Sequence, residues 1–355
     1  MNTGKKKRKI TVFMLAALLL FGLFGCAGKQ GETVKTSAAE TETAGSGGEE
    51  TKTEEAAPLR VGSLKGPTSM GLVHLMDRAA NGEAEGTYVF TMETAADVLL
   101  TAMIKGELDV ALLPANIASV LYQKTEGQVA VIDINTLGVL YVVASDTGIR
   151  SMADLKGKTL YLTGKGQTPE YVLRYLLEES GVKDDEVTLE FKSEAAEVVS
   201  ALAADPAAVG LLPQPFATAA CVQNENFQMV LDLSAEWDSL QGEGGSRLVT
   251  GVTVVRREVL EEREEAVKTF LKERETSSAY ANEHTKEAAE LVAAAGILEK
   301  AAVAEKAMPY CSITCISGEE MKTALEGYLS VLFARDASSV GGALPGGDFY
   351  YTAAK

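Results

Sequence analysis

Strand-like and helix-like segments alternate along most of this chain, and that alternation limits the possible folds more than any other feature. Residues 59–64 read as a strand, and apolar residues within 72–79 then recur with the i, i+3, i+4, i+7 spacing of a helix that buries one face. A second series begins with a strand at 159–163 and a helix at 169–180. Because strands that alternate with helices form βαβ units, the sequence predicts an α/β fold whose sheets are mainly parallel and flanked by helices.

The two series predict two lobes, with the chain crossing between them twice. We place the first crossing near 144–147, after an apolar strand at 139–143, and the second near 242–247, where glycines can absorb backbone changes. Trp237, the only tryptophan, lies just before the second crossing and is expected either to line a cleft or to pack at a hinge. The folded part is about 300 residues long, more than one typical domain. The predicted division is a signal peptide at 1–25, a tether at 26–57, lobe 1 at 58–144 and 247–355, and lobe 2 at 145–246.

The N-terminus has the pattern of a secretory signal peptide. Basic residues at 5–9 precede an apolar run at 10–24, which is shorter than a membrane span requires. The order Leu23-Phe24-Gly25-Cys26 resembles the lipobox of bacterial lipoproteins. That resemblance implies that Cys26 becomes a lipidated N-terminus, and the alternative is a secreted protein in which Cys26 is incidental.

The segment that follows is predicted to be a disordered tether between the lipid anchor and the folded part. It is rich in Gly, Ser, Thr, Ala and Glu and has almost no large apolar residues, so it cannot bury enough surface to offset its ordering entropy. The net charge is −17 and becomes −22 when the five basic residues of the signal peptide are removed. Such an acidic chain argues against nucleic acid as a partner and against electrostatic attraction to a membrane.

Several motifs in a fixed order carry a family resemblance. They are Leu59-Arg60-Val61-Gly62, residues 107–114 (ELDVALLP) and residues 153–158 (ADLKGK), with 318–322 and 341–345 near the C-terminus. Together they resemble the solute-binding proteins of ABC importers with the type-2 periplasmic-binding fold, in the branch of nitrate, sulfonate, taurine and thiamine-precursor binders. The resemblance implies two lobes that close around one small ligand, and an ABC permease with its ATPase as partners. It also implies a lipid-anchored location on the outer face of a Gram-positive plasma membrane.

The candidate ligand-binding residues follow predicted strands, at the points where helices begin. Ligands of open α/β sheets bind beyond the carboxyl ends of the strands, and helix N-termini favour anions. Helix capping is an equally supported role for Thr68, Asn116 and Thr168, and solvation is the alternative for the two lysines. The lysines and helix starts favour an anion or an oxygen-rich polar group as ligand. The predicted ligand-binding residues are Lys65, Thr68, Ser69, Asn116, Lys165, Gln167, Thr168 and Gln214.

We predict neither catalysis nor a cofactor. The chain has two histidines, His74 and His284, and has no H-E-x-x-H or G-x-S-x-G motif, so neither a catalytic zinc nor a serine nucleophile is expected. The glycines around Lys165 do not have the P-loop spacing. The alternatives to a transport role are a surface sensor or adhesion module of the same fold and, less favoured, an extracytoplasmic enzyme.

Three cysteines follow Cys26, and we expect them to be small buried residues rather than disulfide partners. A strand-like pattern at 310–317 places Cys311 and Cys315 on one face, about 13 Å apart, too far for a bridge. A disulfide that involves Cys221 is the less favoured alternative. We also expect a monomer.

Overall fold

The computed structural model describes residues 57–242 and 245–352. The predicted signal peptide, the lipidation of Cys26 and the tether up to residue 56 lie outside the described residues. Among the helices that are described, none has the length and apolar character needed to cross a membrane.

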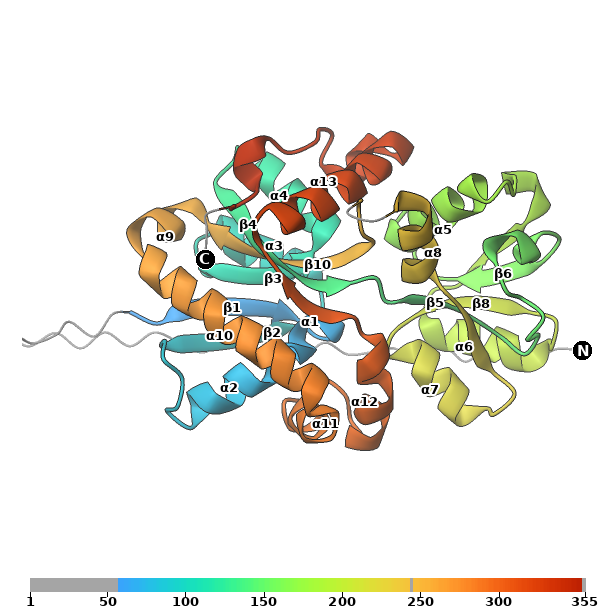
Figure 1. The fold of residues 1–355 in the computed structure, drawn as a ribbon, viewed down its shortest axis with the longest axis horizontal. Coiled ribbons are helices and arrows are strands. Elements are labelled where there is room, and N and C mark those ends of the chain that lie inside the picture. Colours follow the sequence, from blue (N-terminus) through green and yellow to red (C-terminus); the bar gives the residue numbers. More distant parts are fainter. Residues whose placement is uncertain (1–56, 243–244, 353–355) are drawn as a thin grey trace, which may run out of the picture. The chain divides into compact units, whose positions relative to one another are not determined.

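Within the described residues, six strands form the first sheet. They are β1 (Leu59–Leu64), β2 (Tyr88–Glu93), β3 (Val110–Pro114), β4 (Val129–Leu137), β10 (Val249–Arg256) and β11 (Ile313–Ile316). Their order is β11-β4-β10-β3-β1-β2 (Figure 1). Strand β1 pairs in parallel with β2 and β3, whereas β10 runs antiparallel to β3 and β4, and β11 runs antiparallel to β4.

Five strands in the described part of the chain form the second sheet. They are β5 (Leu140–Ala144), β6 (Thr159–Leu162), β7 (Thr188–Phe191), β8 (Val209–Pro213) and β9 (Gln228–Asp232). Their order is β7-β6-β8-β5-β9, with β6 parallel to β7 and β8, and β5 antiparallel to β8 and β9. We call the first sheet with its helices lobe 1, and the second sheet with its helices lobe 2.

The α/β architecture with two sheets is confirmed, but both sheets are mixed rather than mainly parallel. In the first sheet β1 lies between β2 and β3, and in the second sheet β6 lies between β7 and β8, which gives the predicted parallel pairs. The next position is taken by a strand that has just crossed from the other sheet, β10 in the first and β5 in the second, and it runs antiparallel. The crossings therefore produce antiparallel pairs that a local βαβ pattern cannot reveal.

The first crossing lies earlier than predicted. Strand β5, which we expected to end lobe 1, pairs with β8 and β9 in the second sheet, so the chain crosses at Gly138 and Val139 instead of near 144–147. An apolar run of five residues satisfies either sheet equally well, and its local sequence does not specify its partner. The second crossing, predicted near 242–247, follows Gln241 at the end of a helix and precedes β10.

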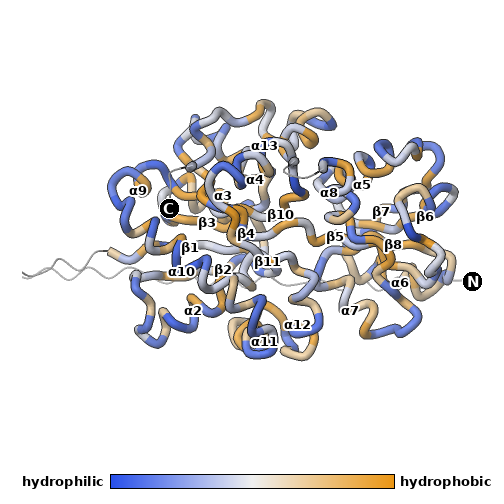
Figure 2. The backbone as a smooth tube through the Cα atoms, in the orientation of Figure 1, coloured by the Kyte–Doolittle hydropathy of each residue, from blue (hydrophilic) through white to orange (hydrophobic). Residues whose placement is uncertain are grey.

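Helices cover both faces of each sheet (Figure 1), and hydrophobic residues are concentrated in central strands such as β4 and β8 (Figure 2). In lobe 2, Val142 faces the core shared with α5 and α8, whereas its neighbour Val143 faces α6 and α7. Lobe 1 contains α1 (Pro67–Met70), α2 (Val73–Ala80), α3 (Ala96–Ile104), α4 (Ala115–Lys124), α9 (Arg257–Glu262), α10 (Glu264–Glu283), α11 (Thr285–Ala294), α12 (Ala301–Ala307) and α13 (Gly318–Arg335). Lobe 2 contains α5 (Thr168–Glu179), α6 (Ala195–Ala204), α7 (Phe216–Gln223) and α8 (Leu233–Gln241). The 3-10 turns are η1 (Met152–Leu155), η2 (Asp184–Glu186), η3 (Met308–Tyr310), η4 (Ala337–Val340) and η5 (Gly347–Phe349).

Trp237 packs at the second crossing and does not line a cleft. Its side chain is fully buried, its Nε1 donates to the carbonyl and Oγ of Ser246 at 3.2 and 3.1 Å, and its ring lies against Tyr175 and Tyr328. Because these two tyrosines come from α5 of lobe 2 and α13 of lobe 1, the indole joins both lobes beside the crossing.

The three described cysteines are free thiols, as expected. Cys311 is buried and follows η3, whereas Cys315 lies in β11 and is only half-buried. The predicted strand at 310–317 is therefore too long, because a 3-10 turn occupies its first residue.

Candidate ligand-binding site

The edges at which the parallel strands end face one another across the first crossing. Two residues, Gly138 and Val139, separate the end of β4 from the start of β5. Strand β3 ends beside the first residues of β10, and β8 ends at Pro213 beside Leu140, the first residue of β5. The C-terminal ends of β1, β2 and β3 therefore face the C-terminal ends of β6, β7 and β8. All eight predicted binding residues lie in the segments that follow these strands.

In lobe 1, the hydroxyl groups after β1 hold the turn into α1. Thr68 Oγ1 and Ser69 Oγ each donate to the carbonyl oxygen of Leu64, both at 2.7 Å, and both side chains are buried. Gly66, not Thr68, precedes the helix as its N-cap, so the capping alternative is wrong for Thr68. Lys65 is exposed and forms no ion pair with any described residue.

A buried polar layer that was not predicted from the sequence lies beside these hydroxyls. Asn135 Nδ2 donates to Thr253 Oγ1 at 3.3 Å, and Thr136 Oγ1 donates to Asn135 Oδ1 at 2.9 Å. A Cβ on Gly251 would lie 2.6 Å from Thr68 Cγ2 and would clash with Asn135, so glycine allows this close approach. The available signal was polar residues inside β4, a strand that is otherwise apolar.

Two other predicted residues lie against the chain's own C-terminal segment. Asn116 Nδ2 donates to the carbonyl of Ser339 at 3.3 Å, and Thr168 lies close to the hydroxyl of Tyr328. Tyr328 is almost fully buried, and burial raises the pKa of its phenol far above the ordinary value. Thr168 thus joins α5 of lobe 2 to α13 of lobe 1.

Gln214 is buried at the end of β8. Its Nε2 lies 3.2 Å from Met229 Sδ, its Oε1 accepts a 3.4 Å hydrogen bond from Thr218 N, and its side chain is only 2% exposed. The side-chain amide of Gln214 therefore contacts residues of lobe 2. The peptide bond between Gln214 and Pro215 is cis.

Unpaired lysines gather at the edge of lobe 2. Lys165 Nζ lies 5.7 Å from the ring centre of Phe191, and Lys192 Nζ lies 4.9 Å from that of Tyr161. Neither ammonium forms an ion pair within the described residues. Lys192 follows β7, and its N–H donates to Leu162 at the end of β6, so it lies near the loop that holds Lys165. Lys192 is not among the predicted residues, although it has the same position after a strand as they do.

The start of α5 is partly neutralised by the protein's own carboxylates. Glu170 Oε2 accepts from Gly166 N at 2.7 Å, and the Tyr171 hydroxyl lies 2.8 Å from both Gly166 O and Asp336 Oδ2. Gln167 is exposed in the same loop. Anion attraction by this helix end alone is therefore weaker than its dipole implies.

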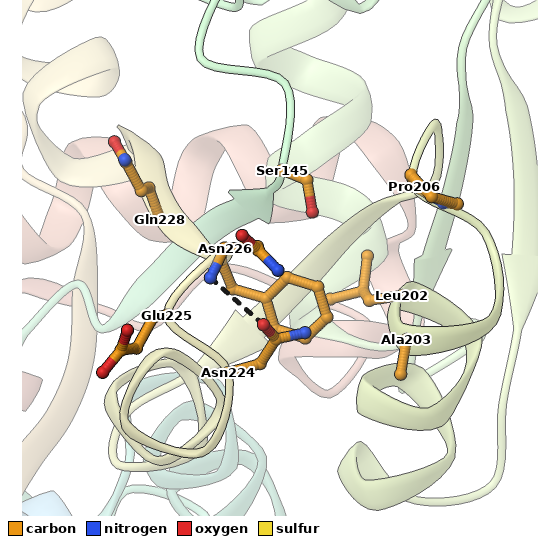
Figure 3. A pocket seen from close by; sticks show the side chains of 9 residues that line it. Ser145, Leu202, Ala203, Pro206, Asn224, Glu225, Asn226 and Gln228 are labelled. Carbon is orange, nitrogen blue, oxygen red and sulfur yellow. Dashed lines mark hydrogen bonds between the residues drawn. The ribbon is translucent and has the colours of Figure 1, made fainter.

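A polar pocket of about 420 Å³ lies at the opposite edge of the second sheet (Figure 3). Ser145 after β5 and Gln228 at the start of β9 line it, and Asn226 N donates to Asn224 Oδ1 at 3.1 Å. It is far from the strand ends that carry the predicted site, because β8 begins at this edge. In the described part of the chain, no cluster of His, Cys, Asp and Glu could hold a metal ion.

Known proteins share both sequence and fold with this chain. The model for the phosphonate periplasmic substrate-binding proteins of ABC transporters matches residues 83–303. Binding proteins of Brucella abortus and Brucella suis are 26% identical over 219 residues, which are 60% of this chain and 64% of theirs. The chain thus spans less than two thirds of the length of these curated relatives.

Three solved structures illustrate the shared fold. An ABC transporter protein from Parabacteroides distasonis has a TM-score of 0.69 and 22% identity, and the match covers 83% of this chain and 98% of that one. The aliphatic sulphonate binding protein SsuA of Escherichia coli has a TM-score of 0.61 and 17% identity, with 79% and 88% covered. The alkanesulfonate-binding protein SsuA of Xanthomonas axonopodis, bound to MOPS, has a TM-score of 0.56 and 18% identity, with 79% and 94% covered. The fold is therefore that of periplasmic binding proteins, and, because the matching model covers more than half of its length, this chain belongs to the family of phosphonate periplasmic substrate-binding proteins of ABC transporters.

Proposed function

We propose that this protein is an extracytoplasmic solute-binding protein that captures a small ligand between its lobes and delivers it to an ABC importer. The observation that carries the proposal is the pair of facing strand ends, joined by two crossings, in a chain of this family. No bond is made or broken in such a role, and we propose that the protein is not an enzyme.

The ligand we propose is a small organic anion. Lys65, Lys165 and Lys192, which form no ion pair with any described residue, supply positive charge at the facing edges of a chain whose net charge is −17. Cation–π contact holds the two lysines of lobe 2 near aromatic rings without neutralising them. The relatives are named for phosphonates and sulfonates, both compact oxyanions that charged ammonium groups and hydroxyl groups recognise well.

Binding would be coupled to the relative position of the lobes. Tyr141 Oη of lobe 2 donates to the carbonyl of Tyr310 in lobe 1 at 3.0 Å, and Thr168 of lobe 2 lies close to the Tyr328 hydroxyl of lobe 1. A ligand that touches both edges favours the arrangement in which these contacts are made. A permease could then distinguish loaded from empty protein by surfaces that both lobes present together.

The proposal extends to the anchor. Cys26 would carry lipid and hold a monomer at the outer face of a Gram-positive plasma membrane, with the segment up to residue 57 as its tether. Expression of the full chain and its Cys26→Ser variant with labelled palmitate tests this. Label and membrane fractionation that persist in the variant would contradict lipidation at Cys26.

Isothermal titration of the full chain with methylphosphonate, ethanesulfonate, taurine and sulfate tests the ligand class. We expect one organic anion to bind, with compaction in small-angle scattering at saturation. Glycerol serves as an uncharged comparison at neutral pH. If no anion binds while the protein is folded, the anion proposal is wrong, and the sensor or adhesion alternative gains weight.

A further inference from the structure

A groove of about 480 Å³ lies between the two lobes, along helix α7. Its lobe 2 wall runs from Thr218 in α7 to Glu225 beyond the end of that helix, and its lobe 1 wall is the segment from Glu305 to Tyr310. Gln214 contacts Thr218 and Met229 at one end of the groove, and from there the groove extends along α7 to Glu225, away from the lysines of the site proposed above. Its two walls come from different lobes, which means that its shape depends on their relative position.

The groove presents charges of both signs that the protein leaves unpaired. Glu225 and Glu305 supply two carboxylates, and Lys306 supplies an ammonium group. Within the described ranges none of the three forms an ion pair. A single-charge ligand would satisfy one sign and leave the other facing it, whereas a zwitterion meets both.

An unmet hydrogen-bond donor also lines this groove. Thr218 is only 4% exposed, and its Oγ1 is buried without a hydrogen-bond partner among the described residues. Buried hydroxyl groups are normally paired because an unpaired one keeps the full cost of its desolvation. An acceptor on an occupant of the groove would remove that cost.

Apolar surface completes the wall. Tyr310 is 43% exposed, and Val222 on α7 is similarly exposed. An apolar body on the ligand would cover both side chains and remove them from water.

We propose that this groove is a second binding site, for a small zwitterion with an apolar body, of which an amino acid with a branched side chain is the simplest example. Its ammonium group faces Glu225 and Glu305, its carboxylate faces Lys306, and its apolar part covers Tyr310. Because both lobes supply the walls, an occupant favours the arrangement in which α7 and α12 are neighbours. This goes beyond the proposed anion transport and is reciprocally coupled to it.

Isothermal titration with three matched probes tests the charge requirement. L-Leucine carries both charges, isoamylamine lacks the carboxylate, and 4-methylpentanoate lacks the ammonium. We expect the full chain to bind leucine at least about tenfold more tightly than either of the others, because each single-charge probe leaves one unmatched sign. Equal binding of all three, or no binding of leucine, would overturn the proposal.

Substitutions of groove residues test whether leucine binds in this groove. We expect Lys306→Met to weaken leucine binding about tenfold and to leave isoamylamine unchanged, and Thr218→Val to weaken leucine about fivefold. Lys300→Met, on the residue before α12 and outside the groove, is the matched control. If all variants bind leucine with equal affinity, leucine binds outside the groove and the proposed site is wrong.

Cys221 gives an independent readout because its half-buried thiol lines the groove. Leucine should slow the alkylation of Cys221 by N-ethylmaleimide without slowing that of Cys315, which lies outside the groove. If saturating leucine leaves the alkylation rate of Cys221 unchanged, the assignment of leucine to this groove is wrong. Anion titrations on the same preparation report the transport site separately, so failure of one proposal leaves the other measurable.

Discussion

Gly138 lies directly against Leu248, so the two crossings between the lobes are packed on each other. A Cβ on Gly138 would be 2.6 Å from Leu248 Cδ2 and would also clash with Ser234 Oγ. Gly138 belongs to the first crossing, and Leu248 immediately precedes β10 at the end of the second. Movement of one lobe against the other must therefore move both crossings together.

Gly138→Ala should destabilise the protein by about 1–3 kcal/mol, because the added methyl group overpacks this contact. The matched control is Gly347→Ala, where an added Cβ meets no atom within 4 Å. Urea unfolding of both variants and the parent checks the prediction. Equal midpoints for Gly138→Ala and the parent would mean that the crossings can separate without cost.

Arg274→Met should destabilise the protein strongly, by about 3–5 kcal/mol, because it leaves a buried carboxylate without its cation. Arg274 Nη2 and Nε lie 2.8 and 2.9 Å from the two carboxylate oxygens of Asp133, and both side chains are 0% exposed. The pair ties α10 to β4 in lobe 1.

Lys268→Met is the control for Arg274→Met because its ammonium pairs with Glu264 on the exposed surface, and we expect a change below about 1 kcal/mol. Guanidinium-induced unfolding measures both variants. Similar losses for the two would show that burial adds nothing to the strength of the Arg274 pair.

Glu273→Gln should make the free energy of unfolding less dependent on pH in the acidic range. Burial alone would raise the pKa of Glu273, but hydrogen bonds from Tyr88 and from the backbone of Glu85 and Gly86 outweigh it and lower that pKa below the ordinary 4.5. A lowered folded-state pKa contributes stability above the unfolded-state value, and that contribution is lost as the pH falls through the folded-state value.

We therefore expect Glu273→Gln to cost about 1.5–3 kcal/mol at pH 7, the range for hydrogen bonds to a charged group. The difference from the parent should shrink as the pH falls below about 4.5. Unfolding free energies at several pH values, with exposed Glu290→Gln as control, measure this. A difference that stays constant down to pH 3 would exclude the charge of Glu273 as its source.

Lys192→Gln should weaken binding of the anion identified by titration about fivefold, as expected for loss of an ion pair worth roughly 1 kcal/mol. The effect should diminish as salt is added, because ions screen this contact. Lys156→Gln is the control, since its ammonium lies 2.6 Å from Glu186 and is already paired. Equal affinities for the two variants would remove Lys192 from the proposed anion site.

The sequence predicted best those features that depend on residues close together in the chain. Apolar spacing located the helix found at α5 within one residue at each end, and turn residues after strands located the segments that begin the helices at the facing edges. These features depend on neighbours a few residues apart, which the chain specifies directly.

Contacts between distant segments were decided only by the tertiary structure. The run at β5 joined the second sheet because its partners, β8 and β9, lie more than 60 residues later. Asn116 is hydrogen-bonded to Ser339 and Thr168 lies close to Tyr328, so side chains predicted to face a ligand also contact the C-terminal segment. Local sequence set what each segment could form, whereas the burial of apolar faces and the pairing of buried polar groups across the whole chain selected which segments meet.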